Sequence, residues 1–153
     1  MTEVLTVNAG SSTIRLNLFD CSEAPPLNHV SHVVHVDSDK RTPAQLLQLF
    51  LQDAGNRPPD LIAHRVVHGG PWQPGSRRID AAVEASIAEA AHLAPLHNPV
   101  ALEWVRACRA QFGAGTPQIA CFDTAEFAEI PAIAREYPLP AALRQRWRLR
   151  RYG

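Results

Sequence analysis

The stretch Leu61–Val67 (LIAHRVV) limits the possible folds of this chain more than any other part of the sequence. It is a nearly continuous apolar run, which is typical of a parallel strand buried on both faces of a sheet. The run Ile119–Phe122 has the same character and ends at Asp123. Helical stretches near residues 81–91 and 100–112 separate the two runs, so the sequence predicts an α/β fold.

The N-terminal third of the sequence predicts further strands in the same sheet. Residues 4–7 are β-prone, residues 8–12 are turn formers, and apolar side chains alternate over residues 14–18, a pattern that indicates a hairpin. A third strand is expected over residues 29–36, and Thr42–Pro43 is a typical helix start. We therefore expect one mixed sheet flanked by helices, with the polar motifs at strand ends, where open α/β sheets bind ligands.

Charge and composition argue against several classes of protein. The 153 residues include 15 Lys+Arg and 15 Asp+Glu, which gives no whole-chain reason to expect nucleic acid or a membrane surface as a partner. An arginine-rich end, residues 144–151, is either a tail for nucleic acid or lipid or a solvated helix. There is no apolar run of transmembrane length and no signal-peptide pattern. Three cysteines without a CxxC spacing indicate free thiols in a reducing cytoplasm.

The turn Asn8–Thr13 (NAGSST), followed by Arg15, is the first segment with the chemistry of a binding site. Small residues let backbone N–H groups and hydroxyls approach a phosphate. The side-chain oxygen of Asn8 suits Mg²⁺ or its water shell, and Arg15 adds a positive charge. A Walker A loop is excluded because no GK[ST] sequence follows. The alternative is an ordinary polar hairpin turn, which uses the same residue types.

An arginine near the end of a buried strand is the second such feature. Arginine is seldom buried without a partner. Arg65 therefore either pairs with a core Asp or clamps a carboxylate or phosphoryl group in two-point geometry. Gly69–Gly70 lets the chain turn sharply or approach a ligand closely. A metal site built on His64 and His68 is a further alternative, but no third ligand is evident.

A carboxylate follows the second buried strand directly. Asp123, in the segment FDTA, can orient a nucleophile or hold a metal-bound water from this position. The alternative is a helix N-cap, because Asp and Thr both cap helices.

The order and combination of these segments resemble the acetate kinase family. Members of that family have an Asn-x-Gly-Ser-Ser-Ser-x-Lys turn after the first strand, and residues 8–15 read NAGSSTIR here. The family string HRVVHGG is unchanged at residues 64–70, and its PLHNP and FDTA segments stand at residues 95–99 and 122–125. The segment YPLP at residues 137–140 and the final RRYG are also similar. The resemblance covers essentially the whole chain in the expected order.

This resemblance implies a fold, a reaction and a set of site residues. The implied fold is a ribonuclease-H-like domain of the actin, sugar-kinase and heat-shock-chaperone ATPase superfamily. The implied reaction moves a phosphoryl group between ATP, with Mg²⁺, and acetate or a similar short carboxylate. The implied site comprises Asn8 for the metal, Gly10, Ser11, Ser12, Thr13 and Arg15 for ATP, Arg65, Val67, Leu96 and His97 for the substrate, and Asp123 for catalysis.

The implied roles are specific. Arg65 would hold the substrate carboxylate, while Val67 and Leu96 would line a pocket for the methyl group. Because a carboxylate is already ionised at neutral pH, Asp123 is interpreted as an orienting or metal-shell group and not as a strong base.

Four positions depart from the family pattern. Arg15 replaces a Lys and keeps the charge but not the point-charge geometry. Thr13 replaces the third Ser and keeps the hydroxyl. Glu126–Phe127 stands where the family has Phe-His, which places an acidic group near a site that has to bind anions.

Family members continue beyond the RYG sequence into a second domain. We therefore expect residues 1–153 to be an N-terminal domain whose C-terminal domain is absent from this chain. Two hypotheses follow. In the first, the chain is part of a cytoplasmic acetate kinase that is a homodimer when complete, and the chain alone is inactive. In the second, it is a truncated, non-catalytic remnant that binds anions or a partner.

Overall fold

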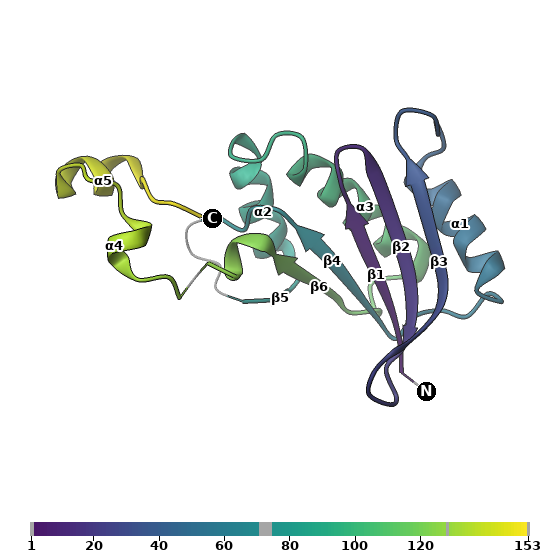
Figure 1. The fold of residues 1–153 in the computed structure, drawn as a ribbon. Coiled ribbons are helices and arrows are strands. Elements are labelled where there is room, and N and C mark those ends of the chain that lie inside the picture. Colours follow the sequence, from purple (N-terminus) through teal and green to yellow (C-terminus); the bar gives the residue numbers. More distant parts are fainter. Residues whose placement is uncertain (1, 71–74, 128, 153) are drawn as a thin grey trace.

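A six-stranded mixed sheet is the centre of the molecule (Figure 1). The computed structural model of the chain describes residues 2–70, 75–127 and 129–152. The strand order is β3-β2-β1-β4-β6-β5. The strands are β1 (Glu3–Ala9), β2 (Thr13–Asp20), β3 (Leu27–His35), β4 (Leu61–Val66), β5 (Arg77–Arg78) and β6 (Gln118–Phe122).

The pairing of the strands confirms the N-terminal hairpin and the mixed sheet expected from the sequence, and it adds the order of the strands. β1, β2 and β3 form an antiparallel meander, whereas β4 lies parallel to β1 and β6 lies parallel to β4. The short strand β5 adds an antiparallel edge beside β6. It was not predicted, because two consecutive arginines carry no strand periodicity. The sheet places the ends of β1, β4 and β6 next to one another.

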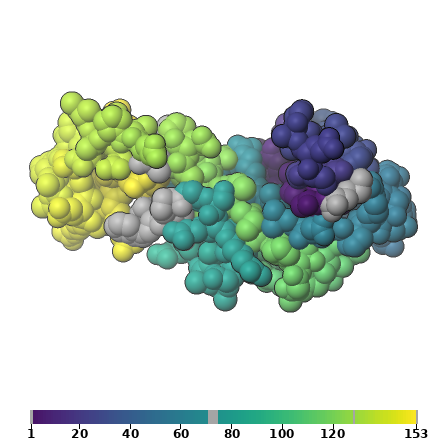
Figure 2. All heavy atoms as spheres, turned by 90° about the horizontal axis from the view of Figure 1, so that it is seen from below, coloured from purple at the N-terminus to yellow at the C-terminus, as the bar shows by residue number. Residues whose placement is uncertain are grey.

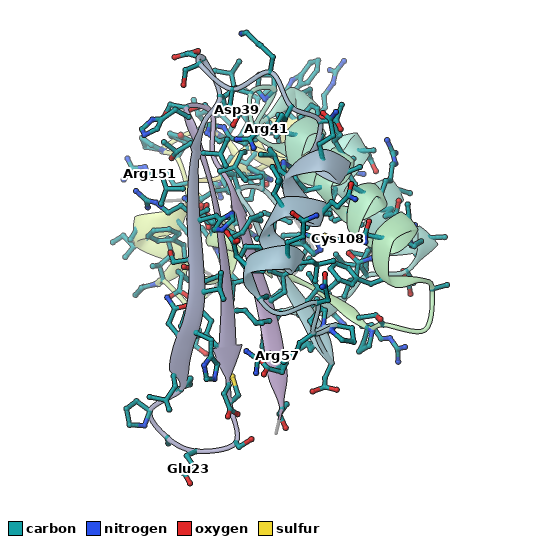
Figure 3. The ribbon with its side chains drawn as sticks, turned by 90° about the vertical axis from the view of Figure 1, so that its right-hand side faces the viewer. Glu23, Asp39, Arg41, Arg57, Cys108 and Arg151 are labelled. Atoms are coloured by element: carbon teal, nitrogen blue, oxygen red, sulfur yellow. The ribbon has the colours of Figure 1, made fainter. Side chains whose placement is uncertain are left out.

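Three longer helices cover one face of the sheet: α1 (Pro43–Asp53), α2 (Ala81–Glu89) and α3 (Asn98–Phe112). Figure 3 shows this arrangement edge-on, with the helices on one side of the strands. Short 3₁₀ turns η1 (Ala90–His92) and η2 (Asp123–Ala125) follow α2 and β6. The second helical stretch was expected to begin at Val100 but begins at Asn98, because Pro99 is compatible with the first turn of a helix.

Local sequence fixes where these helices begin. The Thr42 hydroxyl accepts from the Gln45 amide, and the Gln45 side chain accepts in return from the Thr42 amide at 2.9 Å, which is a capping box. Asp80 caps α2 through its carboxylate, which accepts from the Val83 amide at 2.8 Å. Such caps are each worth about 1 kcal/mol.

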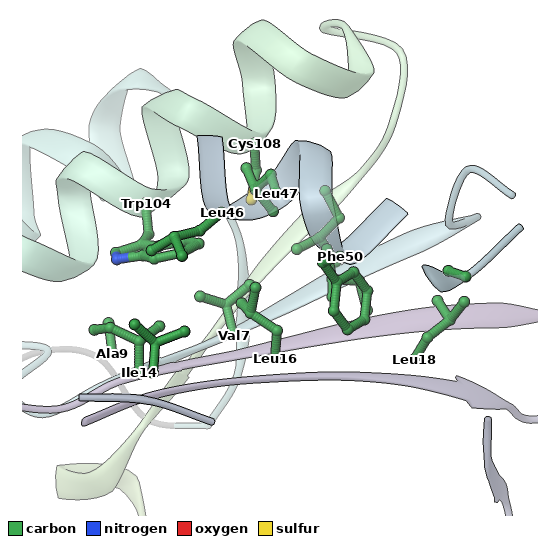
Figure 4. Close-up of a cluster of buried hydrophobic side chains, with 14 residues drawn as sticks. Val7, Ala9, Ile14, Leu16, Leu18, Leu46, Leu47, Phe50, Trp104 and Cys108 are labelled. Carbon is green, nitrogen blue, oxygen red and sulfur yellow. The ribbon is translucent and has the colours of Figure 1, made fainter. Parts of the chain in front are cut away.

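The main hydrophobic core lies between the sheet and α1 and α3 (Figure 4). Alternate side chains of β1 and β2 point into it, among them Val7 and Leu16, and they meet Leu47, Phe50 and Trp104 from the helices. Each fully buried side chain of this size contributes about 1.5–3 kcal/mol. The period of two then directs the intervening residues of the same strands, including Asn8 and Arg15, to the opposite face.

Two short helices, α4 (Ala132–Arg135) and α5 (Ala141–Trp147), lie apart from the sheet beyond β6 (Figures 1 and 2). Neither contains a buried residue, and the side chains of Ile133 and Trp147 are 92% and 63% exposed. The solvated-helix interpretation of the arginine-rich end agrees with α5. None of the helices in the described part of the chain is long and apolar enough to cross a membrane.

Candidate active site

Three polar residues form a row across the open face of the sheet. Asn8 of β1 is the register partner of Arg15 on β2 and of Arg65 on β4. Because register partners point to the same face, the three side chains lie side by side, away from the hydrophobic core. Cys121 of β6 continues the row as the register partner of Arg65.

Arg65 is the centre of this row and is held by two other motifs. Its Nε donates to both carboxylate oxygens of Asp123, at 2.9 and 3.1 Å, and its Nη2 donates to Oδ2 at 2.7 Å. Its Nη1 donates to Asn8 Oδ1 at 3.2 Å. The structure therefore brings together Asn8, Arg65 and Asp123, which are far apart in the sequence.

The Arg65–Asp123 pair is accessible to solvent. The Arg65 side chain is 49% exposed and the Asp123 side chain is 35% exposed. Hydrogen bonding by Asp123 is the main cause that raises the pKa of Arg65 above its ordinary value, so the guanidinium is charged at every relevant pH. A guanidinium has five N–H groups. Three of them are used here, by Nε, Nη2 and Nη1, which leaves one on each terminal nitrogen for a ligand.

The alternatives raised by the sequence can now be weighed. Asp123 does not act as an N-cap: η2 has no side-chain cap, and the Asp123 carboxylate bonds to Arg65. Arg65 does pair with an aspartate, but with one that is partly exposed and not in the core.

A metal site on His64 and His68 is not supported, because the described residues contain no group of three potential metal ligands. The buried His64 points to the core, where its Nε2 meets Gln118 Oε1 at 2.6 Å. Burial lowers the pKa of His64 to about 4. His68 accepts from the Gly70 amide through Nδ1 at 3.0 Å.

A buried asparagine fixes the turn that follows β4, a role that sequence reasoning missed. Asn98 Oδ1 accepts from the His68 amide at 3.2 Å, and its Nδ2 donates to the carbonyls of His68 and Ile87 at 2.9 and 3.0 Å. Thr124 adds a second support, because its hydroxyl accepts from the Gly69 amide at 3.3 Å. The only signal in the sequence was the presence of Asn98 in PLHNP and of Thr124 in FDTA. These two motifs thus hold the HGG turn in place.

The hairpin turn beside Asn8 requires glycine at position 10 for steric reasons. The Gly10 amide donates to the Thr13 carbonyl at 2.9 Å, and a Cβ on Gly10 would lie 2.9 Å from that same oxygen. Ser11 and Ser12 are exposed at the tip of the turn. The turn therefore has a structural need for Gly10, whereas its hydroxyls remain accessible.

The residues expected to bind the substrate are less closely grouped. Val67 follows β4 directly and is partly exposed, whereas Leu96 is 68% exposed in the turn before α3. His97 precedes α3, and its side chain makes no hydrogen bond or ion pair with a described residue. No hydrogen bond or ion pair joins His97 to Arg65 within the described residues. Glu126 is exposed after η2 and forms no ion pair with them.

The C-terminal residues return to the HGG turn. The Tyr152 ring lies edge-on to the His68 ring with centroids 4.4 Å apart, and the Arg150 guanidinium lies 4.6 Å from the Tyr152 ring. Cys121 lies on the other side of the site, where the Ser76 hydroxyl is 3.6 Å from its sulfur. Sequence reasoning had placed neither Tyr152 beside His68 nor Cys121 beside Arg65.

A family model described as the acetokinase family matches residues 3–153. The chain belongs to this family. Acetate kinases of Thermoanaerobacter pseudethanolicus and Thermosipho africanus are 30% and 34% identical over 99% and 98% of the chain, but these matches cover only 44% and 43% of the two relatives. The alignments run over 178 and 176 positions, more than the 153 residues here, so the relatives have additional residues within the matched stretch.

Solved structures of the acetokinase family have the same fold. A propionate kinase from Francisella tularensis has a TM-score of 0.82 at 29% identity, and the acetate kinase of Porphyromonas gingivalis has a TM-score of 0.79 at 28% identity. Each match covers the whole chain and 45% of the solved protein. The fold predicted from the sequence, a ribonuclease-H-like domain of the actin, sugar-kinase and chaperone ATPase superfamily, is confirmed. The chain spans less than half the length of these relatives.

Proposed function

We propose that the chain is the N-terminal domain of a cytoplasmic, ATP-dependent kinase that phosphorylates acetate or a similar short carboxylate. The observation that best supports this proposal is the convergence of Asn8, Arg65 and Asp123 from three separate motifs. In the reaction, a carboxylate oxygen bonds to the γ-phosphorus of ATP, and the bond from that phosphorus to the leaving oxygen of ADP breaks. The products are an acyl phosphate and ADP. The substrate is already ionised, so no base has to remove a proton.

Arg65 is proposed to hold the substrate and to stabilise the phosphoryl group during transfer. Its two remaining N–H groups suit the oxygens of a carboxylate or phosphate. Phosphoryl transfer depends mainly on positioning and on positive charge near the transferred group. Arg15 supplies a second cation in the same row, and we assign it, with Gly10, Ser11, Ser12 and Thr13, to the phosphates of ATP.

The oxygen atoms around Arg65 also fit a magnesium ion. Asn8 Oδ1 and the Asp123 carboxylate both bond to one guanidinium, so two hard oxygen donors face one small region. Mg²⁺ is commonly held by one or two such donors together with substrate phosphates. We therefore assign Asn8 and Asp123 to the metal that accompanies ATP, where it would neutralise phosphate charge. Asp123 would in addition keep Arg65 oriented.

The methyl group of the substrate is assigned to Val67 and Leu96, with His97 at the rim of the same site. The exposure of Leu96, at 68%, supports a pocket whose other wall comes from a second domain. By the same reasoning, ATP binding and dimerisation of the complete enzyme depend on residues outside this chain. The other candidate function is a non-catalytic anion-binding module, for which the two remaining N–H groups of the exposed Arg65 are the supporting observation.

A fusion experiment separates these two functions. The second domain of the Thermoanaerobacter pseudethanolicus enzyme is joined after residue 153, and acetyl phosphate formation from acetate and ATP is measured. We expect turnover by the fusion and none by residues 1–153 or by the added domain alone. A well-folded fusion without activity that still binds phosphate through Arg65 would favour the anion-binding module. Clear turnover by the isolated chain would contradict the proposed need for a second domain.

A further inference from the structure

The three backbone N–H groups of the HGG turn all donate to side chains of the chain itself. The His68 amide donates to Asn98 Oδ1 at 3.2 Å, and the Gly69 amide donates to the Thr124 hydroxyl at 3.3 Å. The Gly70 amide donates to Nδ1 of the His68 ring at 3.0 Å. A loop binds phosphate when successive amides face the ligand. Because these three amides are occupied, the turn contributes to the site through its shape and not by binding an anion.

The bond from the Gly70 amide requires a neutral His68 ring. Nδ1 can accept this bond only when it carries no proton, so the single proton of the neutral ring lies on Nε2. Burial lowers the pKa of His68 below its ordinary value, and repulsion by His92 and Arg150 lowers it further. The ring is therefore neutral at pH 7, and the bond that closes the turn is present.

The second ring nitrogen of His68 has no hydrogen-bond partner. His68 is only 7% exposed, and its Nε2 is buried without an acceptor among the described residues. The orientation of this end of the ring therefore depends on packing. The Tyr152 ring supplies that packing, with ring centroids 4.4 Å apart and an interplanar angle of 61°. The face of an aromatic ring is also a weak acceptor for an N–H group.

Tyr152 belongs to a segment that leads back from α5 towards the sheet (Figure 1). The Arg151 amide donates to the Arg135 carbonyl of α4 at 2.8 Å, and the Arg151 guanidinium lies 5.4 Å from the centroid of the Tyr137 ring. Residues 150–152 thus form a strap, which is anchored to α4 and contacts the HGG turn.

The two site residues nearest to this turn differ in what holds them. Arg65 is fixed by hydrogen bonds to Asn8 and Asp123, neither of which belongs to the turn. Val67 has an apolar side chain and follows Val66, the last residue of β4 that pairs with β6. The placement of Val67 therefore depends on the conformation of the turn that comes directly after it.

We propose that Tyr152 is a positioning residue of the site and acts through His68. The strap holds the His68 ring, the ring holds the Gly70 amide, and the closed turn places Val67 where the methyl group of the substrate would lie. The identity of the substrate rests on the proposed function, whereas the contacts between these residues do not. A loosened turn would weaken substrate binding, while Arg65, which is held separately, would keep its part in phosphoryl transfer.

Nuclear magnetic resonance of residues 1–153 tests the contacts without any reaction. Tyr152→Leu should speed amide exchange at Gly70 by about tenfold or more, because a hydrogen-bonded amide is protected from exchange. It should also lower the order parameters of the Val67 methyl groups. The Arg65 Nε–H signal should stay in place as an internal control. Tyr152→Phe keeps the ring and should match the parent. Unchanged exchange at Gly70 in Tyr152→Leu would overturn the proposal.

A double-mutant cycle tests whether Tyr152 acts through His68. His68→Leu removes the Nδ1 acceptor and should speed exchange at Gly70 by itself. Addition of Tyr152→Leu to this variant should change the exchange little, because the contact between the two rings is already lost, whereas independent effects would add. Additive effects would show that Tyr152 reaches the turn by another route and would contradict the proposal.

The fusion with a second domain supplies the kinetic test. Tyr152→Leu should raise the KM for acetate about tenfold and leave kcat nearly unchanged, the pattern of lost ground-state binding. Tyr152→Phe should keep the KM of the parent. A merely structural role would lower the melting temperature and the active fraction at constant KM, and that result would overturn the proposal. A parent fusion without turnover would count against the proposed function alone, and the exchange and relaxation data would then decide the role of Tyr152.

Discussion

The sequence predicts that Arg65 either clamps an anion or pairs with an aspartate, but it does not predict which residues contact Arg65. The sequence indicates an arginine at a strand end, and it cannot show that Asp123 and Asn8 meet it, because that meeting depends on the register of β1, β4 and β6. In the structure, Asp123 occupies one side of the guanidinium and neutralises its charge. Two predictions follow from this arrangement.

Substitution of Arg65 should impair the reaction far more than the fold. In the fusion with a second domain, Arg65→Ala should reduce kcat by roughly 10²–10³, as expected for loss of one preorganised donor to developing charge. Arg65→Leu should also raise the KM for acetate. The melting temperature should change little, because exposed ion pairs contribute about 0–1 kcal/mol. Near-normal kcat/KM in both variants would exclude Arg65 from the site.

Asp123→Asn separates the charge of this side chain from its shape. We expect most of kcat to be lost in the fusion, with a melting temperature close to that of the parent. Because the resident carboxylate no longer neutralises Arg65, phosphate should bind the variant chain more tightly than the parent, as measured by calorimetry. The double variant with Glu126→Gln checks whether the second carboxylate substitutes for the first. Full activity in the double variant would leave Asp123 with a structural role alone.

The strands and long helices were predictable because their periodicity is strong and their caps are conventional. The turn after β4 was not, since its conformation is set by a side chain from α3 that is distant in sequence. Asn98 satisfies one amide and two carbonyls in the interior. The PLHNP segment therefore contributes to the candidate site indirectly, because its Asn98 fixes the backbone of the turn that follows β4.

Asn98→Ala should therefore be among the most destabilising single substitutions in the chain. Each buried backbone group left without a partner costs about 1–3 kcal/mol, so the free energy of unfolding should fall by several kcal/mol. His97→Ala, one residue earlier and partly exposed, should change it by about 0.5 kcal/mol or less. Urea unfolding of both variants provides the comparison. Similar stability in the two would show that solvent replaces the bonds of Asn98.

The buried His64 in β4 should make stability depend on pH. Its pKa is about 4 in the folded chain and about 6.5 when unfolded, so the folded state binds fewer protons. The stabilising contribution of neutral His64 to the free energy of unfolding is fully present above pH 6.5. It is lost as the pH falls towards 4, and the total loss is about 3 kcal/mol. Burial of His68 acts in the same direction. His64→Leu should flatten the curve of stability against pH. Parallel curves for parent and His64→Leu would disprove this assignment.

The molecule as a whole is a sheet with helices on one face only. Side chains on the other face, such as Thr6, Asn17 and Ala63, are partly exposed along the whole of β1, β2 and β4. The continuous apolar runs predicted that β4 and β6 are buried on both faces, but this prediction was wrong, because buried side chains alternate with partly exposed or exposed ones along both strands. Asn8, Arg15 and Arg65 lie on this open face, and α4 and α5 lie apart from the sheet, so the three side chains are accessible from the open side.

One consequence concerns how steeply the chain unfolds in denaturant. The slope of the unfolding free energy against urea concentration scales with the surface that unfolding exposes, and it is about 1–3 kcal/mol/M for small proteins. One face of the sheet is already exposed to solvent in the folded chain. Helices α4 and α5 contain no buried residue, so their unfolding exposes little additional surface. The slope, followed by fluorescence of the buried Trp104, should be shallower than that of a domain of equal length with both sheet faces covered.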